Sequence, residues 1–163
     1  MDLDTLVSLL AHDDVAFVVA ALGVLARLPK PPRSALPYPR KLVVSTHAEI
    51  RFGALAAGGD HVGVEWRRIA KGDESPVVRA LAVERWGAER GRAIAPDLAR
   101  CLRTERDWRP RAALTEALAR MGDVGVEAVT PLLTDGHDDA RAAAVTIMLR
   151  NGREAWLAAR FLA

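Results

Sequence analysis

The chain has 163 residues, of which 50% are hydrophobic, 30 are Ala, 20 are Leu and only eight are aromatic. Its 23 Lys and Arg residues nearly balance its 21 Asp and Glu residues, and a formal net charge of +2 excludes a protein that binds nucleic acid by net charge alone. A single cysteine, Cys101, excludes an intramolecular disulfide and a CxxC motif for metal or redox chemistry. Because Ala and Leu are strong helix formers, the composition predicts an all-α fold.

The first residues of the sequence are not typical of a signal peptide, and we expect no targeting segment there. Its first residues, Met1 to Asp4, are acidic where a signal peptide is basic. The longest apolar run, Val15 to Ala26, is too short to span a bilayer as a helix. We therefore expect a cytoplasmic protein without a membrane partner.

Prolines gather after the first apolar run: five of the nine fall between Pro29 and Pro39. Proline lacks an N–H group and fixes φ, so residues 29–39 are predicted to form an extended, polyproline-like loop, followed by a short helix from Pro39 to Val44. Such a loop either docks an aromatic groove or contacts a phosphate, or it is a solvated linker across an irregular first unit. The linker is the simpler interpretation.

A pattern of about thirty residues recurs along the rest of the chain, and its mark is an arginine six positions after an acidic residue. Three copies have both residues: Asp73/Arg79, Glu105/Arg111 and Asp135/Arg141. In a fourth copy Ser45 precedes Arg51, and a looser copy at His12 lacks the arginine.

Each copy is predicted to begin with a helix whose buried face includes the residues three and seven positions after the arginine, as the helical period requires. These residues are Ala54, Ala82, Leu114 and Ala144, and Gly58, Trp86, Leu118 and Met148. Glycines at 58–59, 87, 122 and 152 are predicted to end these helices. A second, shorter helix is predicted over residues 60–71, 95–103, 124–134 and 153–161.

The pattern resembles the HEAT-repeat family, in particular the bacterial HEAT-like units related to those of phycobilin lyases, from about Leu3 to Ala163. The resemblance implies an α-α superhelix: a HEAT-like solenoid of about five helix pairs, with the first and last units atypical. Residues 1–163 then form a single repeat domain, with approximate units at 1–44, 45–72, 73–104, 105–134 and 135–163. The resemblance also implies a structural ladder between units, made by Asp73, Arg79, Glu105, Arg111, Asp135 and Arg141.

Basic residues gather on the predicted second helices of two central units. We call five of them the basic strip: Arg67, Arg68, Lys71, Arg100 and Arg103. If second helices line a concave surface, as the resemblance implies, the basic strip suits an acidic protein segment or a nucleic-acid backbone. In the alternative interpretation the arginines pair with Glu65, Asp97 and Glu105 and form a solvated face.

Trp108 is the aromatic residue that the sequence predicts to be exposed and to anchor a partner, because it lies in a turn between Asp107 and Arg109. The other three tryptophans fall on apolar helical faces and are expected in the core: Trp66, Trp86 and Trp156. Cys101 has apolar neighbours at helical spacing and is expected to be a small core residue.

The sequence shows no nucleophile with a base, paired carboxylates, phosphate-binding loop or metal-ligand spacing. His12, His47 and His137 occupy the same place in their respective units and are expected to be too far apart to share a metal. We therefore expect a non-catalytic scaffold or adaptor that binds another protein, without cofactor or metal.

Two alternatives stay open. The first is a nucleic-acid-binding protein similar to the HEAT-like DNA-repair glycosylases, using the arginines of the central units, although no residue matches the catalytic aspartate of that family. The second is an accessory subunit or lyase that acts on a bound chromophore, and it rests on the resemblance alone.

Overall fold

The structure is a computed structural model that describes residues 2–58 and 66–161. Every regular element in these ranges is a helix, and the helices pack against their neighbours, so the predicted all-α repeat fold is confirmed. The chain divides into two compact units, residues 1–65 and 66–163, and each is described by itself. Gly59, Glu65 and the first part of the helix predicted over 60–71 lie outside the described residues. The single array of five repeat units stays a prediction.

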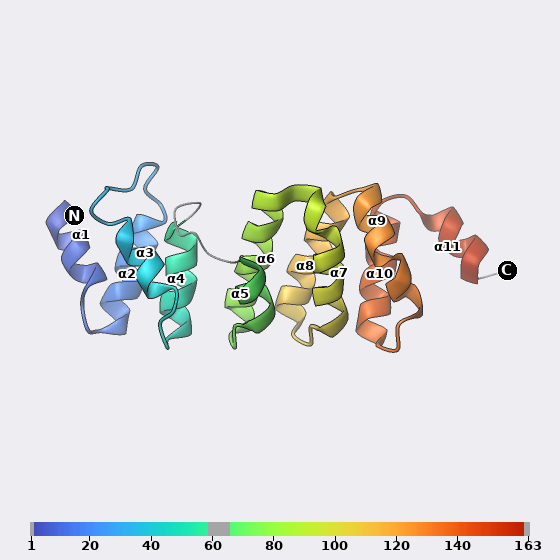
Figure 1. Cartoon of the computed structure of the whole chain (residues 1–163), viewed down its shortest axis with the longest axis horizontal. Coiled ribbons are helices and arrows are strands. Elements are labelled where there is room, and N and C mark those ends of the chain that lie inside the picture. Colours follow the sequence, from blue (N-terminus) through green and yellow to red (C-terminus); the bar gives the residue numbers. More distant parts are fainter. Residues whose placement is uncertain (1, 59–65, 162–163) are drawn as a thin grey trace. The chain divides into compact units, whose positions relative to one another are not determined.

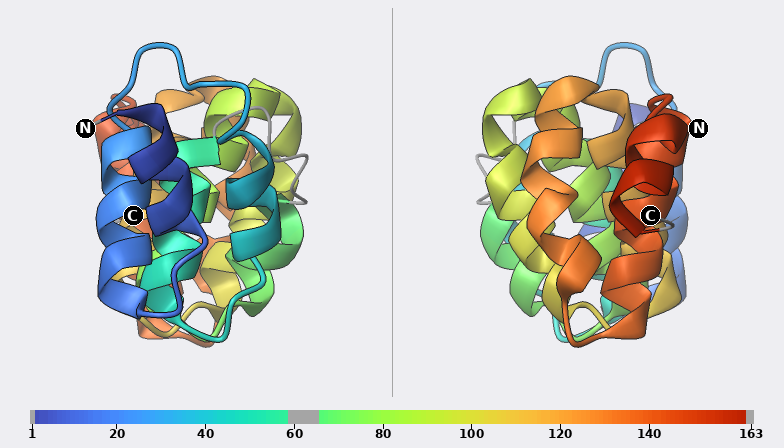
Figure 2. Two further views of the ribbon diagram at one scale, coloured as in Figure 1. Left: turned by 90° about the vertical axis from the view of Figure 1, so that its left-hand side faces the viewer. Right: turned by 90° about the vertical axis from the view of Figure 1, so that its right-hand side faces the viewer.

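The first unit contains α1 (Leu3–Leu10), α2 (Val15–Leu25), α3 (Pro37–Leu42) and α4 (Ala48–Gly58). Helix α1 packs on α2, while α2 and α3 both pack on α4 (Figure 2, left). Helix α1 is an addition to the expected elements. Its signal is Asp2, whose carboxylate accepts the backbone N–H of Thr5 at 2.8 Å and caps the helix. Leu6 and Leu10, one turn apart, then face the core of this unit.

The proline-rich segment differs from its prediction. The loop ends before Pro37, which takes a first-turn position of α3, and Pro39 is buried inside the same helix. Both prolines fit there because the first N–H groups of a helix have no partner within it. The preceding residues are turned rather than extended, since the N–H of Ala35 donates to the carbonyl oxygen of Pro32 at 3.0 Å. Ala35 is fully buried, so this loop also covers the core of the first unit.

The second unit is built from helix pairs (Figure 1). The first helices of the pairs, α6, α8 and α10, pack side by side, and α5, α7 and α9 pack along them. Short 3-10 turns precede α7 and follow α9. The bounds are α5 (Trp66–Gly72), α6 (Pro76–Arg90), α7 (Ala95–Thr104), α8 (Trp108–Arg120), α9 (Asp123–Val129), α10 (Asp138–Arg150) and α11 (Glu154–Phe161), with the 3-10 turns at Gly91–Ile94 and Thr130–Thr134.

The predicted buried face of the first helices is present in both units. All eight residues lying three and seven positions after the repeat arginines are buried: Ala54, Ala82, Leu114 and Ala144, and Gly58, Trp86, Leu118 and Met148. Alanine at three of these positions removes bulk where helix axes approach each other. Trp66 is buried as well, as predicted.

One predicted helix end is wrong. Helix α6 does not stop at Gly87 but continues to Arg90 and ends at Gly91, whose φ is 57°. Gly87 lies inside the helix, where a Cβ atom would be 3.6 Å from that of Ala117, so this glycine borders a helix contact. Gly122 and Gly152 do have positive φ angles, 63° and 68°, at helix ends as predicted.

The last helix of the second unit is atypical. No residue of α11 is buried, and Trp156 is 42% exposed, which corrects the expectation that it belongs to the core. The reason is its place at the end of the unit: among the described helices α11 packs on α10 (Figure 2, right). Within the described residues, no helix has both the length and the apolar character needed to cross a membrane.

Candidate partner-binding surface

The repeat arginines organise the turn that precedes each first helix. In all four copies the guanidinium donates a hydrogen bond to the backbone carbonyl oxygen six residues earlier, at 2.6 to 3.3 Å. In three copies it also reaches the carbonyl oxygen five residues earlier, at 2.8 to 3.2 Å. These arginines are Arg51, Arg79, Arg111 and Arg141. Each one therefore satisfies backbone groups that its own turn would otherwise leave without an intramolecular partner.

The residue six positions before each arginine closes the same turn from the other side. Its side-chain oxygen accepts the backbone N–H two residues further on, at 2.9 to 3.2 Å. These residues are Ser45, Asp73, Glu105 and Asp135. A serine hydroxyl can accept this bond as a carboxylate does, which explains how Ser45 replaces the acid in its copy.

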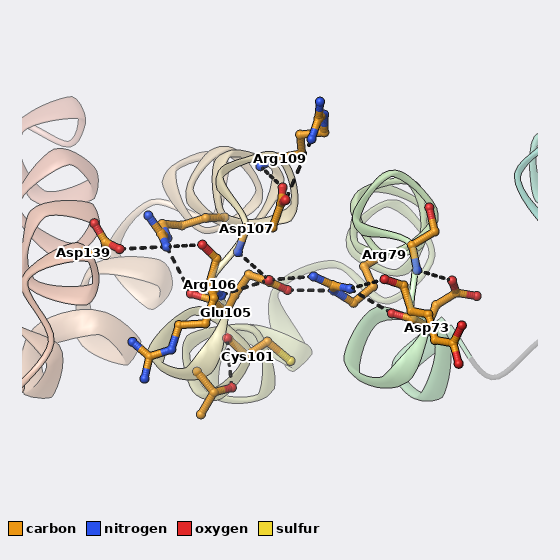
Figure 3. Close-up of polar contacts among 12 residues, drawn as sticks. Asp73, Arg79, Cys101, Glu105, Arg106, Asp107, Arg109 and Asp139 are labelled. Atoms are coloured by element: carbon orange, nitrogen blue, oxygen red, sulfur yellow. Dashed lines mark hydrogen bonds and ion pairs between the residues drawn. The ribbon is translucent and has the colours of Figure 1, made fainter. Parts of the chain in front are cut away.

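One arginine also joins two successive copies. The Nε and Nη2 atoms of Arg79 donate to the two carboxylate oxygens of Glu105, at 2.9 and 2.8 Å (Figure 3). The two side chains are only 15% and 10% exposed. Burial by itself would raise the pKa of Glu105, but hydrogen bonds from Arg79 and from the backbone of Asp107 and Arg106 outweigh it and lower that pKa.

The next copy is joined differently. Arg111 pairs with Asp139 at 2.8 Å, not with Asp135, and Asp139 is 60% exposed. The Nε atom of Arg111 is buried and has no hydrogen-bond partner among the described residues. Asp135 instead binds Arg103 at 2.6 Å and His137 at 2.8 Å. Hydrogen bonds from the side chain and backbone of His137 are the main reason that the pKa of Asp135 is lowered. The remaining repeat arginine, Arg141, pairs with Asp138 on its own helix.

The basic strip is brought together on α5 and α7. Arg67 of α5 and Arg100 of α7 share one carboxylate oxygen of Asp97, at 3.2 and 2.7 Å. Arg103 is held by Asp135, as described above. Each of these three arginines keeps more than half of its side chain exposed, at 55%, 65% and 61%. The pairing with Asp97 was foreseen in the solvated-face interpretation, whereas Glu105 binds Arg79 instead.

Two members of the basic strip have no acidic partner among the described residues. Arg68 and Lys71 are exposed, and neither forms an ion pair within the part of the chain that the structure describes. The five cations of the basic strip therefore meet two carboxylates, Asp97 and Asp135. Counted over the described residues, the strip has a local excess of positive charge, although the whole chain is nearly neutral.

Beside the basic strip the surface is hollowed. A shallow depression of about 520 Å³ lies between the end of α5, α7 and the turn before α8, and we call it the cationic depression. Four cations and one acid contribute to its lining: Lys71, Arg79, Arg100, Arg106 and Glu105. Three smaller residues complete it: Ala70, Cys101 and Thr104.

Cys101 is one of two buried residues in the lining of this depression, with Ala70. It is 6% exposed, and burial raises the pKa of its thiol despite the nearby charges of Lys71, Arg67 and Arg100, which act in the opposite direction. A raised pKa keeps the sulfur in its neutral, weakly nucleophilic form. Cys101 is thus a core residue, as the sequence predicts, rather than a reactive one.

Trp108 lies on a different surface. It begins α8, is 66% exposed, and carries the guanidinium of Arg109 over its ring at 4.9 Å. It lines a groove of about 590 Å³ formed by the first helices α6, α8 and α10, and no residue of the basic strip lines that groove. The structure therefore separates Trp108 from the basic strip, two features that the sequence could not place relative to each other.

The histidines have local roles. His12 accepts the N–H of Asp14 at 2.9 Å and packs edge-on against Phe17, and His137 bridges Asp135 and Arg106. Within residues 2–58 and 66–161, no three His, Cys, Asp or Glu side chains form a group able to hold a metal ion.

In a comparison with protein families, a model described as HEAT repeats matches residues 65–150. The matched range contains the whole basic strip and the three copies that have both the acid and the arginine. A comparison with curated proteins finds no match.

Proposed function

The chain belongs to the HEAT-repeat family, and from this premise we propose that it is a non-catalytic scaffold that binds an acidic segment of another protein along the basic strip. HEAT repeats commonly mediate protein–protein interaction, because stacked helix pairs offer an extended surface. We propose a location in the cytoplasm, where a single thiol stays reduced.

The observation that carries the proposal is the state of the arginines on α5 and α7. Arg67, Arg100 and Arg103 are each held by a carboxylate while more than half of each side chain stays exposed. An arginine held in this way has less side-chain freedom to lose when it binds a second anion, so less affinity is lost to ordering. Its remaining N–H groups can bind a partner carboxylate in the paired geometry that favours arginine.

An acidic protein segment fits this surface better than a nucleic acid. Asp97 and Asp135 interrupt the cations of the strip, so the strip is not the continuous positively charged track that follows a nucleic-acid backbone, whereas the carboxylates of a peptide can pair with separate arginines. The chain has only three Lys residues and a net charge of +2, which gives little long-range attraction for nucleic acid. Nucleic-acid binding is kept as an outcome of the test.

The test compares two chain variants by fluorescence polarisation. The strip variant carries Arg67→Glu, Arg68→Glu and Arg100→Glu, and the control carries Arg92→Glu, Arg109→Glu and Arg160→Glu, three exposed arginines outside the strip. The probes are a fluorescein-labelled peptide of twelve glutamates and a labelled DNA duplex, each over a salt series. Circular dichroism establishes that both variants keep their helix content.

We expect the strip variant to lose at least about tenfold in affinity for the peptide, and the control to change less than about twofold, because charge reversal adds repulsion only where the peptide lies. No binding of the peptide at low salt, or equal loss in both variants, would overturn the proposal. Tighter binding of DNA than of the peptide, lost in the strip variant, would establish the nucleic-acid alternative instead.

A further inference from the structure

We propose that residues 27–41 of the first unit bind the phosphate backbone of a nucleic-acid duplex without reading its sequence. We call this stretch the polybasic segment, and its cations are Arg27, Lys30, Arg33, Arg40 and Lys41. The inference goes beyond the proposed function, because it gives the first unit a partner of its own while the basic strip of the second unit binds a protein.

The near-neutral charge of the whole chain conceals the polybasic segment. Residues 15–48 contain these five cations and no Asp or Glu, so this stretch by itself carries a formal charge of +5. Positive charge gathered in one part of a nearly neutral chain is the pattern expected of a local contact with a polyanion.

The cations of the polybasic segment are available to an anion. All five residues are exposed. Within residues 2–58 and 66–161, none of their side chains forms an ion pair or a hydrogen bond. The basic strip differs, because Asp97 and Asp135 hold three of its five cations. The polybasic segment is therefore the uninterrupted series of positive charges that suits a nucleic-acid backbone.

The backbone that carries these cations is fixed to the core of the first unit. Ala35 and Pro39 are buried, and the N–H of Tyr38 donates to the carbonyl oxygen of Ala35 at 3.1 Å. The N–H of Arg27 donates to the carbonyl oxygen of Val24 at 3.0 Å, where α2 ends. Figure 2 (left) shows the loop arching from the end of α2 to the start of α3, past the ends of the helices. A segment held at both ends loses less conformational freedom when it binds a ligand.

The acids among the described residues of the first unit lie at helix starts, outside the polybasic segment. Asp13 and Asp14 precede α2, whereas the polybasic segment follows it. A helix of eleven residues is about 16 Å long, about twice the Debye length in physiological salt, so the repulsion from these two acids is screened. Asp2 and Asp4 lie at the positive end of the dipole of α1, and both carboxylate oxygens of Asp2 are bound by Thr5.

The polybasic segment offers charge without an apolar face, which favours a nucleic acid over a membrane surface. Tyr38 and Leu42 pack against the core of the first unit. Within residues 27–41, Leu28 is the one large hydrophobic residue that is exposed, at 37%. Stable attachment to a lipid surface uses an apolar helix face or an acyl chain in addition to charge.

A duplex fits the polybasic segment better than a single strand or an acidic peptide does. Proteins that bind single strands stack the bases on exposed aromatic rings, whereas Tyr38, the aromatic residue of this segment, packs against the core. The cations lie on a loop and on α3, and a duplex presents a phosphate charge about every 1.7 Å along its axis, over both strands. This array can meet cations at several places at once, whereas an extended peptide follows a single path. Contacts to phosphates alone carry no sequence information.

The experiment measures binding of the full chain to a short fluorescein-labelled DNA duplex by fluorescence polarisation over a salt series. The segment variant carries Lys30→Gln, Arg33→Gln and Arg40→Gln, and a second variant carries Arg27→Gln and Lys41→Gln. The matched control removes three cations of the basic strip, through Arg67→Gln, Arg68→Gln and Arg100→Gln. Circular dichroism establishes that each variant keeps its helix content.

Two further probes separate other partners from the duplex. The peptide of twelve glutamates represents an acidic protein segment. Vesicles of phosphatidylcholine and phosphatidylserine, mixed at about three to one, represent an anionic lipid surface.

We expect the segment variant to lose at least about tenfold in affinity for the duplex at low salt, and the strip control less than about threefold, although both remove three positive charges. The second variant should lose about fivefold, because it lacks two cations. The slope of log affinity against log salt should be smaller by about 2 to 3 in the segment variant, about one for each phosphate contact removed. A duplex of unrelated sequence should bind equally well.

No binding of the duplex at low salt, or equal losses in the segment variant and the strip control, would overturn this inference and leave the proposed function intact. Loss in the strip control alone would overturn it as well and would favour nucleic-acid binding at the strip. If the segment variant loses the glutamate peptide or the vesicles as strongly as the duplex, the segment binds anions in general and the inference fails.

Discussion

Arg79 binds both carboxylate oxygens of Glu105, which lies 26 residues further along the chain. The same guanidinium donates to the carbonyl oxygens of Asp73 and Glu74 in its own turn. One side chain therefore closes a turn within one helix pair and connects that pair to the next. Because both partners are largely buried, this contact should matter more to stability than the ion pairs on the surface.

Glu105→Gln should lower the free energy of unfolding by about 1–3 kcal/mol, because it leaves the buried guanidinium of Arg79 with a neutral partner. The measurement is urea denaturation followed by circular dichroism. Glu116→Gln is the control: Glu116 also binds two arginines, Arg120 and Arg150, but all three side chains are exposed, so stability should change little. Equal losses in the two variants would show that burial of the Arg79–Glu105 pair contributes nothing.

Stability should fall as the solution is acidified. The pKa of Glu105 is lower in the folded chain than in the unfolded one, so its carboxylate stabilises the fold above about pH 5, and this contribution disappears as the pH falls through the folded pKa. Melting temperatures measured from pH 6 to about pH 3 should therefore decline, and less steeply for Glu105→Gln. A parallel decline in the wild type and the variant would contradict this linkage. Glu84→Gln, at an exposed acid on α6, serves as the control.

Arg111→Ala should cost about 1–2 kcal/mol, less than Arg79→Ala, since Arg111 binds an exposed carboxylate and one of its buried nitrogens has no partner in the described structure. Both variants lose the hydrogen bonds to their own turn, so the difference between them isolates the contact to the next copy. Thermal unfolding of the two variants side by side measures it. A larger loss for Arg111→Ala would refute this ranking.

Gly125→Ala should destabilise the second unit by about 1–3 kcal/mol, because the added Cβ would lie 2.0 Å from the carbonyl oxygen of Leu118 and α9 would have to move away from α8. Gly87→Ala is the matched control. Gly87 lies inside α6, where alanine favours the helix, and its added Cβ would make an ordinary contact of 3.6 Å with Ala117 of α8. The free energy of unfolding should therefore stay the same or rise. Chemical denaturation measures the free energy of unfolding of both variants. The prediction fails if Gly125→Ala is as stable as the wild type.

Trp108→Ala should change stability by no more than about 0.5 kcal/mol, because the ring is mostly exposed. Trp86→Ala, at a buried position of α6, should cost about 3–5 kcal/mol. Binding of the glutamate peptide should be unaffected by Trp108→Ala, since Trp108 lies outside the basic strip and its depression. Weakened peptide binding would place Trp108 in the same interface as the strip.

The helical repeat was predictable because its evidence is local. The face that Ala82 and Trp86 share follows from helical spacing, and positive φ at Gly122 and Gly152 follows from the conformational freedom of glycine. The stop expected at Gly87 was wrong because small residues also serve where helices touch, and only the contact with Ala117 distinguishes the two uses. The exposed side of Trp156 likewise depends on what packs beside α11, which spacing along the chain does not reveal.

The candidate surface was predictable only in part. Residue spacing placed Arg67 and Arg100 on neighbouring second helices, and one interpretation of the sequence named Asp97 as an acid that pairs with the strip arginines, as the structure shows. The choice of Asp139 rather than Asp135 by Arg111 depends on tertiary geometry, as does the hollow that Lys71 shares with Arg106. Neither has a signal in the sequence, since the residues involved are far apart along the chain.

Each repeat arginine stabilises the turn of its own helix pair through hydrogen bonds to carbonyl oxygens of that turn, so the turn does not depend on the neighbouring pair for these bonds. A duplicated helix pair would keep the hydrogen bonds of its own turn. After a duplication or a deletion, only the contacts between the newly adjacent pairs would have to form anew. The Ser45 copy and the acidic copies show that the first position of this turn accepts different residues, while all four copies keep the arginine. We therefore expect that the second unit can lengthen or shorten by whole helix pairs without changes inside any one of them.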